Sequence, residues 1–216
     1  MKDGLYTGTA HIPPYAHHPP DISYYQRVEL AASRKIEPFQ QGEFDYLCGL
    51  YAAINAIRLA RSEIAPLNYL QTCQLFNSGM AFLSDRGKLQ LSLTWGMELD
   101  CRYDLAAHLA ATASDKYVSL SVERADGVGW SSIDSAFGWI ECSLADQKPV
   151  MVYIDGRLGP STLDHYSVIS GISAKTITLF DSIDLRFLRR SNCGLSEGRY
   201  LLPADGLLRI VATPPG

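Results

Sequence analysis

The feature that most constrains the fold is a change of residue pattern along the chain. From Leu47 to Leu59, apolar residues recur at spacings of three and four, as on one face of a helix. Residues 67–83 and 97–117 have similar helical patterns, whereas β-branched runs dominate after Tyr117. Helices therefore come first and strands later, which predicts the α+β class rather than alternating βαβ units.

The second half of the chain has the alternating apolar runs that are typical of strands. We expect strands over 117–123, 148–155, 165–172, 175–182 and 206–213, and one helix over 131–147. Because Gly, Asp and Pro separate the runs, they predict an antiparallel sheet. A helical N-terminal half packed against this sheet would leave a cleft between the two halves, where a functional site is expected.

With 216 residues, the chain is long enough for one good-sized domain, which we place at residues 36–216. Residues 1–35 are predicted to be an irregular, proline-rich arm, because "HIPPYAHHPP" suits loop or polyproline II. His17 and His18 in this arm are adjacent, and adjacent side chains rarely converge on one ion. We therefore expect no metal site.

Charge and hydropathy exclude several classes of partner. The net charge of -4 offers no electrostatic attraction to nucleic acid or to an anionic membrane. No apolar stretch reaches the roughly 18 residues of a membrane-spanning helix. The first residues, "MKDGLYTGTAHIPPYAHHPP", lack the basic and apolar regions of a secretion signal. We expect a cytoplasmic protein with no nucleic-acid or membrane partner.

The five cysteines are far apart and odd in number, and none forms a CxxC pair. In the cytoplasm they would be reduced. Cys73, Cys101 and Cys142 occur in apolar, helix-like surroundings and are interpreted as packing residues. Cys193 in "RRSNCGLSEG" is followed by polar residues, which predicts a loop thiol.

Cys48 differs from the other cysteines because it begins the apolar helix. The partial positive charge and the unpaired N–H groups of a helix N-terminus stabilise a thiolate, which is the nucleophilic form of cysteine. Gly49 has no side chain and would let a substrate approach the backbone. We interpret Cys48 as a nucleophile whose amide helps to hold an oxyanion, although Cys48 taken alone would be interpreted as a buried helix cysteine.

A candidate base and its orienting group occur in the β half. His165 begins "HYSVISGI" and Asp181 ends "TLFD", sixteen residues later, with one short turn between them. On two antiparallel strands, Asp181 can accept from one imidazole nitrogen of His165 and leave the other for Cys48. Asp164 and Asp184 are alternative orienting groups in less suitable positions.

Two glutamines precede the nucleophile. An amide from Gln40 or Gln41 would add a second donor to an oxyanion pocket, and loss of such a donor typically costs about 2.7–4 kcal/mol of barrier. Either glutamine could take this role.

Gln41, the Cys48-Gly49 pair on an Ala-rich helix, "DHYSVISGI" and "LFDS" together resemble the papain-like cysteine peptidase superfamily, and within it the bacterial bacteriocin-leader-processing branch. The resemblance covers about residues 36–185. It implies a papain-like fold, with Gln41 as oxyanion donor, Cys48 as nucleophile, His165 as base and Asp181 as its orienter. The chain departs from the family in two ways: the family's glutamine lies one residue closer to the cysteine, and Leu47 stands where the family has an acidic residue.

The sequence therefore predicts a cysteine hydrolase that cleaves a peptide or isopeptide bond through a Cys48 thioester. Its partner would be a protein or peptide substrate, and it would need no metal or organic cofactor. Two alternatives stay open: a transglutaminase or acyltransferase that uses the same triad, and an inactive papain-like scaffold used for binding.

Overall fold

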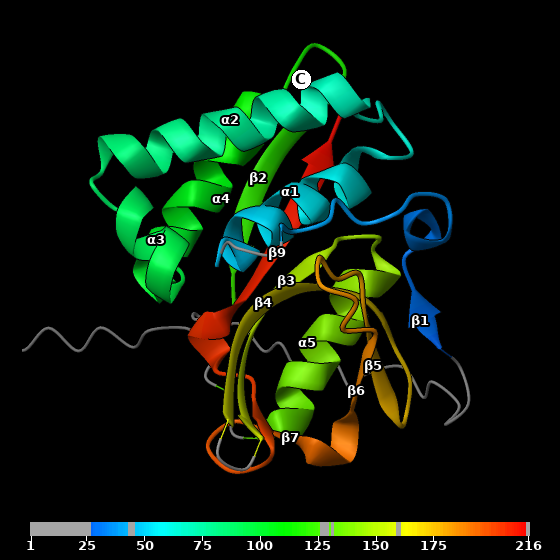
Figure 1. Cartoon of the computed structure of the whole chain (residues 1–216). Coiled ribbons are helices and arrows are strands. Elements are labelled where there is room, and N and C mark those ends of the chain that lie inside the picture. Colours follow the sequence, from blue (N-terminus) through cyan, green and yellow to red (C-terminus); the bar gives the residue numbers. More distant parts are fainter. Residues whose placement is uncertain (1–26, 43–45, 126–129, 131, 159–160, 215–216) are drawn as a thin grey trace, which may run out of the picture.

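The computed structural model describes residues 27–42, 46–125, 130, 132–158 and 161–214. His17 and His18, and with them the expectation about metal binding in the arm, lie outside the described residues. The described chain contains five α-helices and a sheet of nine strands, which confirms the α+β class (Figure 1).

Four helices come first along the chain, and the fifth follows the first strand of the β half. They are α1 (Cys48–Arg61), α2 (Tyr69–Asp85), α3 (Leu89–Trp95), α4 (Leu99–Ala113) and α5 (Ile133–Ala145). Short 3-10 turns occur at Ala31–Arg34, Arg190–Asn192 and Ala204–Gly206. Helix α3 was not predicted from the sequence, because its seven residues are too short to display a helical period.

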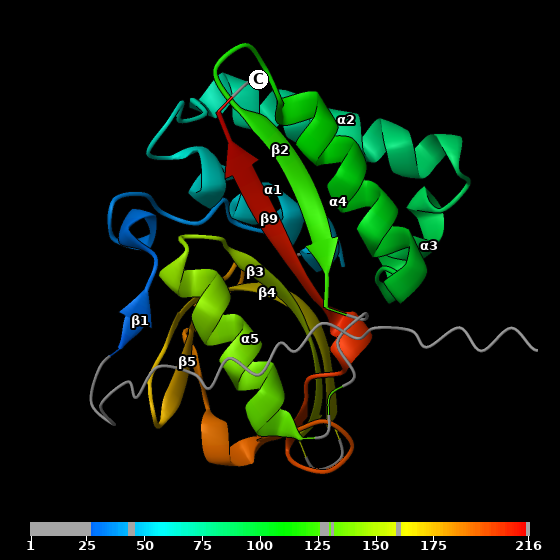
Figure 2. The same cartoon turned by 180° about the vertical axis from the view of Figure 1, so that it is seen from behind.

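The sheet is antiparallel along its main path, in the order β2-β9-β3-β4-β5-β6 (Figures 1 and 2). These strands are β2 (Ser119–Arg124), β3 (Val150–Leu158), β4 (Ser161–Ile172), β5 (Thr176–Leu179), β6 (Phe187–Arg189) and β9 (Leu207–Thr213). Three two-residue strands complete it: β1 (Val28–Glu29), β7 (Cys193–Gly194) and β8 (Tyr200–Leu201). Strand β1 pairs with β4, and β7 and β8 form a parallel pair.

Helix α1 is the central helix of the molecule and is almost entirely buried. It packs against β4 and β9 as well as against α2 and α4. Small residues allow this close packing: Ala53 and Ala56 are fully buried, and a Cβ at Gly79 of α2 would lie 2.4 Å from Leu50. A helix held on several sides gives its first residue, Cys48, a fixed position.

Strand β4 is buried continuously from His165 to Ile172, so both of its faces are covered. Helices α1 and α5 both pack against it. The strand begins at Ser161, four residues before the predicted start, because the long strand β3 continues to pair with it as far as Leu158. His165 therefore lies inside β4 rather than opening it.

The structure also corrects two predictions about cysteines outside the site. Cys142 is exposed on α5 and Cys73 is half-buried, so of the three expected packing cysteines only Cys101 is buried. Arg190 is half-buried and pairs with Glu141 at 2.8 Å. Within the described ranges, no helix has both the length and the apolar character needed to cross a membrane.

Candidate active site

Cys48 is the first residue of α1 and is 7% exposed. At this position its backbone N–H has no acceptor within the helix, and the positive end of the helix lies at the sulfur. The thiol lies 4.0 Å from the Tyr46 carbonyl oxygen, at the long limit for a sulfur hydrogen bond.

The expectation that Gly49 lets a substrate approach the backbone is wrong. A Cβ on Gly49 would lie 3.2 Å from the sulfur of Met97 and 3.3 Å from the Tyr166 ring. The missing side chain therefore makes room for these two residues, which pack against the first turn of α1 and help to fix Cys48 in place.

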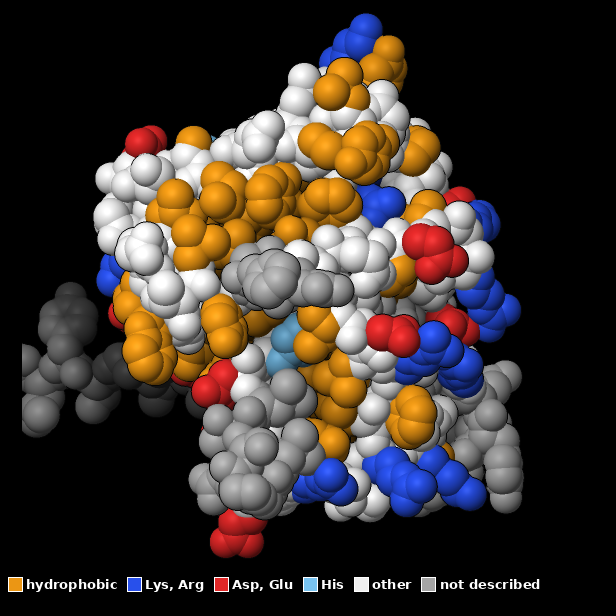
Figure 3. Space-filling view, in the orientation of Figure 1, with side chains coloured by type: hydrophobic (Ala, Val, Ile, Leu, Met, Phe, Trp, Pro, Cys, Tyr) orange, Lys and Arg blue, Asp and Glu red, His pale blue; other side chains and the backbone are white. Residues whose placement is uncertain are grey.

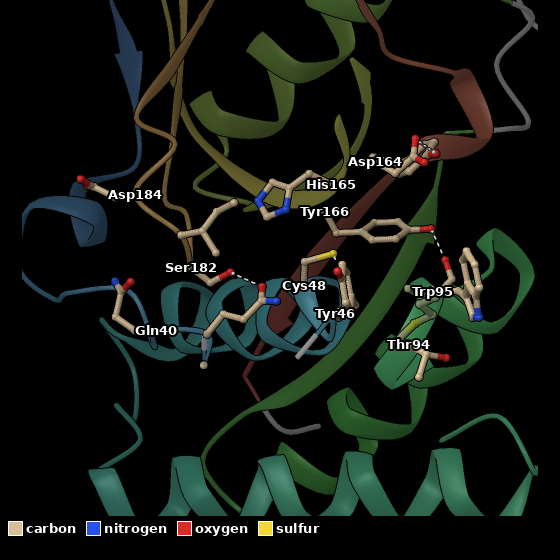
Figure 4. Close-up of a pocket in the computed structure, with 16 residues that line it drawn as sticks. Gln40, Tyr46, Cys48, Thr94, Trp95, Asp164, His165, Tyr166, Ser182 and Asp184 are labelled. Carbon is tan, nitrogen blue, oxygen red and sulfur yellow. Dashed lines mark hydrogen bonds between the residues drawn. The ribbon is translucent and has the colours of Figure 1, made fainter. Parts of the chain in front are cut away.

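The His165 ring is joined to Asp181 by a short hydrogen bond, 2.7 Å between Nε2 and Oδ2. Both side chains are almost completely buried. The other carboxylate oxygen of Asp181 accepts the backbone N–H groups of Ile183 at 2.8 Å and Leu185 at 3.2 Å. The carboxylate thus cannot rotate freely, and it holds the imidazole so that Nδ1 remains for Cys48, whose side chain lies next to the ring (Figure 4).

The pKa values of His165 and Asp181 are determined by two opposing effects, burial and the attraction between the two side chains. Burial lowers the pKa of His165, but the hydrogen bonds to Asp181 and Cys48 outweigh it and raise the pKa to about 9. Burial raises the pKa of Asp181, but the hydrogen bond and the charge of His165 outweigh it, so the pKa of the carboxyl is below its ordinary value. Near neutral pH the pair is therefore imidazolium and carboxylate.

The alternative orienting groups have other partners. Asp164 accepts the hydroxyl of Tyr153 at 3.1 Å, and Asp184 pairs with Arg186 at 2.9 Å. Of the three candidate carboxylates, the structure brings Asp181 to the imidazole. Its position two residues after the end of β5, opposite the buried part of β4, explains the contact.

The structure also separates the two glutamines. Gln41 is tied to the loop that carries Asp181, because its backbone N–H donates to the Ser182 carbonyl at 3.0 Å and its Oε1 accepts the Ser182 hydroxyl at 3.4 Å. This second bond ties the side-chain amide of Gln41 to the same loop. Gln40 donates its own Nε2 to the Pro38 carbonyl at 3.4 Å and lies well away from Cys48 (Figure 4).

Cys48 and His165 line a cleft of about 920 Å³. The helical half contributes Tyr46, Trp95 and Met97 to its wall, and the β half contributes Tyr153, Asp164, Tyr166 and Ser182. A histidine side chain is visible at the bottom of a hollow in the molecular surface (Figure 3). The sulfur of Cys48 and the imidazole of His165 therefore belong to the wall of one cleft.

Several residues of this wall were missed by the sequence analysis. The hydroxyl of Tyr166 donates to the Met97 carbonyl at 3.0 Å, and its ring lies 4.9 Å from that of Tyr153. Trp95 is 83% exposed at the rim. The "WG" pair was a usable signal, because Gly96 has a φ of 87° and ends α3 with a turn that few other residues would allow.

The second Cys-Gly pair, Cys193-Gly194, forms strand β7 and is not the loop thiol that was predicted. Cys193 is buried in the hydrophobic core, and its thiol donates to the Arg189 carbonyl at 3.4 Å. Pairing with β8 draws this polar stretch inward, which the local sequence did not indicate. Burial raises the pKa of the Cys193 thiol to about 11.

His108, on α4, has its own partners outside the cleft: its Nε2 lies 2.9 Å from the Ser78 hydroxyl and its ring stacks on Phe82. Within the part of the chain that the structure describes, no three His, Cys, Asp or Glu side chains are grouped so that they could hold a metal ion. No protein-family model matches this chain, and no curated protein matches its sequence. The site is therefore interpreted from its own geometry.

Proposed function

We propose that this protein is a cysteine hydrolase of papain-like architecture that cleaves a peptide or isopeptide bond through a thioester on Cys48. One observation carries the proposal: a buried His165–Asp181 pair, joined at 2.7 Å, presents its imidazole to a cysteine at a helix N-terminus. A nucleophile, a base and a group that orients the base are the parts that such chemistry requires.

The arrangement of elements agrees with the papain-like interpretation. The helix that begins with Cys48 packs against β4, which carries His165, and Asp181 follows the next strand of the sheet. The order Gln41, Cys48, His165, Asp181 along the chain is the order of the resembling family.

In the proposed first step, the sulfur of Cys48 attacks the substrate carbonyl carbon while the proton resides on His165. The oxyanion that forms would be stabilised by the backbone N–H of Cys48 and by Nε2 of Gln41. His165 then gives its proton to the departing amine nitrogen, and the acyl group remains on sulfur as a thioester. Asp181 keeps the imidazole in the required tautomer and orientation throughout.

In the second step, water replaces the amine. The now neutral His165 takes a proton from the water, and the resulting hydroxide attacks the thioester carbonyl. Collapse of this second tetrahedral species releases the acid and returns the thiolate with its imidazolium.

The test is the rate of alkylation by iodoacetamide, located by peptide mass spectrometry at each thiol. We expect Cys48 to react fast in the native protein and Cys193 to stay unmodified near neutral pH, because burial holds its pKa at about 11. The Cys48→Ala variant should lose both this labelling and any turnover, whereas Cys193→Ala should keep both. The reverse pattern would refute the assignment.

Two further experiments identify the substrate and the acyl acceptor. The Cys48→Ala variant should retain its bound partner, which mass spectrometry can identify. Incubation of that partner with the native protein and a labelled primary amine distinguishes two chemistries. Cleavage without label indicates hydrolysis, and incorporation of the amine indicates acyl transfer by the same three side chains.

A further inference from the structure

The charges along the cleft wall are unbalanced. Besides His165, the charged side chains among the described residues that line it are two carboxylates, Asp164 and Asp184, with no Lys or Arg. Figure 4 shows them on opposite sides of Cys48. Asp184 is neutralised by Arg186 through contacts of 2.9 and 3.3 Å. Asp164 has no cationic partner within the described ranges; its hydrogen-bond donor is the neutral hydroxyl of Tyr153.

A second carboxylate adds to this negative potential. Asp155 of β3 is the register partner of Asp164 of β4, so two like charges occupy directly opposite positions of adjacent strands, an arrangement that destabilises a sheet. Among the residues that the structure describes, no cation pairs with Asp155 either. Burial, the hydrogen bond to Asp164 and the two negative charges all raise the pKa of Tyr153, which keeps its hydroxyl protonated.

Aromatic side chains accompany these carboxylates. Trp95 projects at the rim on the same side of Cys48 as Asp164 (Figure 4), and its indole is 83% exposed. Tyr153 and Tyr166 form a ring pair at 4.9 Å in the same wall. Aromatic faces attract cations, and a carboxylate beside them strengthens that attraction. We call this region, formed by Trp95, Tyr153 and Asp164, the acidic end of the cleft.

Building on the proposed function, we propose that the acidic end of the cleft binds a cationic group of the substrate, an ammonium or a guanidinium, close to the bond that is cleaved. Asp164 is the residue that determines this specificity. The preferred substrate is therefore a peptide or isopeptide with a basic group beside the scissile bond, and an acidic group at the same place is rejected.

The test uses three thiol reagents that differ in charge: the trimethylammonioethyl, methyl and sulfonatoethyl methanethiosulfonates. Rates of modification of Cys48 are measured on the full chain by non-reducing peptide mass spectrometry, near neutral pH and in about 150 mM salt, so that distant charges are screened. Each rate is divided by the rate of the same reagent with a small free thiol. We expect the cationic reagent to react about fivefold faster than the anionic one on this scale.

Two matched variants locate the cause. Asp164→Asn removes the charge but keeps an acceptor for Tyr153, and it should abolish the preference. Asp184→Asn removes the other carboxylate of the wall; asparagine tolerates the positive φ of 65° at this position, and the preference should persist.

The outcomes separate the two proposals. If Cys48 reacts with all three reagents at equal normalised rates, or faster with the anion, the inference fails while the proposed function stands. The inference also fails if Asp184→Asn abolishes the preference and Asp164→Asn does not. If Cys48 reacts with none of the reagents, the proposed function fails, and the inference fails with it.

Discussion

Two Cys-Gly pairs occur in this chain, and they are almost equally buried. Cys48 is 7% exposed and Cys193 is 9% exposed, and both belong to the hydrophobic core. Yet Cys48 begins a helix of fourteen residues, beside an imidazole and a cleft, whereas Cys193 lies in a strand of two residues, 3.4 Å from a backbone carbonyl. Burial alone therefore gives no basis for assigning different roles to the two thiols.

What distinguishes them is the set of groups that each thiol faces. Positive potential from a helix N-terminus and from an imidazolium stabilises a thiolate, and an apolar enclosure destabilises it. Under the proposed function, the same dipeptide thus has different chemistry at its two positions in one molecule. Three substitutions or measurements, in order of decreasing effect, sharpen this comparison or break it.

Replacing His165 with glutamine should make the thiol of Cys48 as unreactive as we expect the thiol of Cys193 to be. Without the imidazolium the sulfur loses its charge partner and its proton donor, so we expect turnover to fall by about 10²–10⁴-fold and alkylation of Cys48 to slow in parallel. Both rates are measured on protein whose circular dichroism matches the parent. An unchanged rate at Cys48 would mean that the helix terminus, and not His165, activates the sulfur.

The two glycines should differ in how much each contributes to stability. Here the Cys193-Gly194 pair, and not the Cys48-Gly49 pair, is expected to be the more sensitive to substitution. A Cβ at Gly194 would lie 1.6 Å from the carbonyl oxygen of Glu197, so Gly194→Ala must displace backbone and should lower the free energy of unfolding by about 3 kcal/mol. At Gly49 the nearest atom is the sulfur of the flexible Met97 side chain, at 3.2 Å.

For Gly49→Ala, the strain is offset by the better helix propensity of alanine, so the free energy of unfolding should stay within about 1 kcal/mol of the parent value. Urea denaturation of both variants provides the comparison. If both variants lose the same free energy of unfolding, the backbone contact at Gly194 is no more restrictive than the side-chain contact at Gly49.

The third comparison concerns the pH dependence of stability, where the expected effect is smaller than that of Gly194→Ala. The pKa of His165 is raised from 6.5 to about 9 in the folded chain, so its contribution is fully present below pH 6.5 and is lost as the pH rises through 9. We expect a fall in the free energy of unfolding, on the order of 2 kcal/mol, between these values. Asp181→Asn removes the main charge partner and should flatten this fall; an equally steep curve would contradict the pairing.

Much of the architecture could be predicted from local pattern. The helix of Cys48 and the longer helices α2, α4 and α5 each leave a period in the sequence that reports which face is buried, and their order before most strands was predicted from it. The approach of His165 and Asp181 was also predictable, because a single hairpin joins them and a hairpin is a local structure.

The remainder depended on contacts between segments that are distant in sequence. Ser182, far along the chain, distinguishes Gln41 from Gln40, and pairing with β8 draws Cys193 into the core. The rim that includes Trp95 exists because a short helix, α3, leads into the loop beside Tyr166.

The sequence by itself determined the α+β class, the helix that begins at Cys48 and the chemical types present at the site, because these follow from residue period and from neighbours within one element. Only the tertiary structure decided which glutamine is anchored at the cleft and which thiol is enclosed. Each of these choices depends on distances across the molecule, and residue types and spacing carry no direct information about such distances.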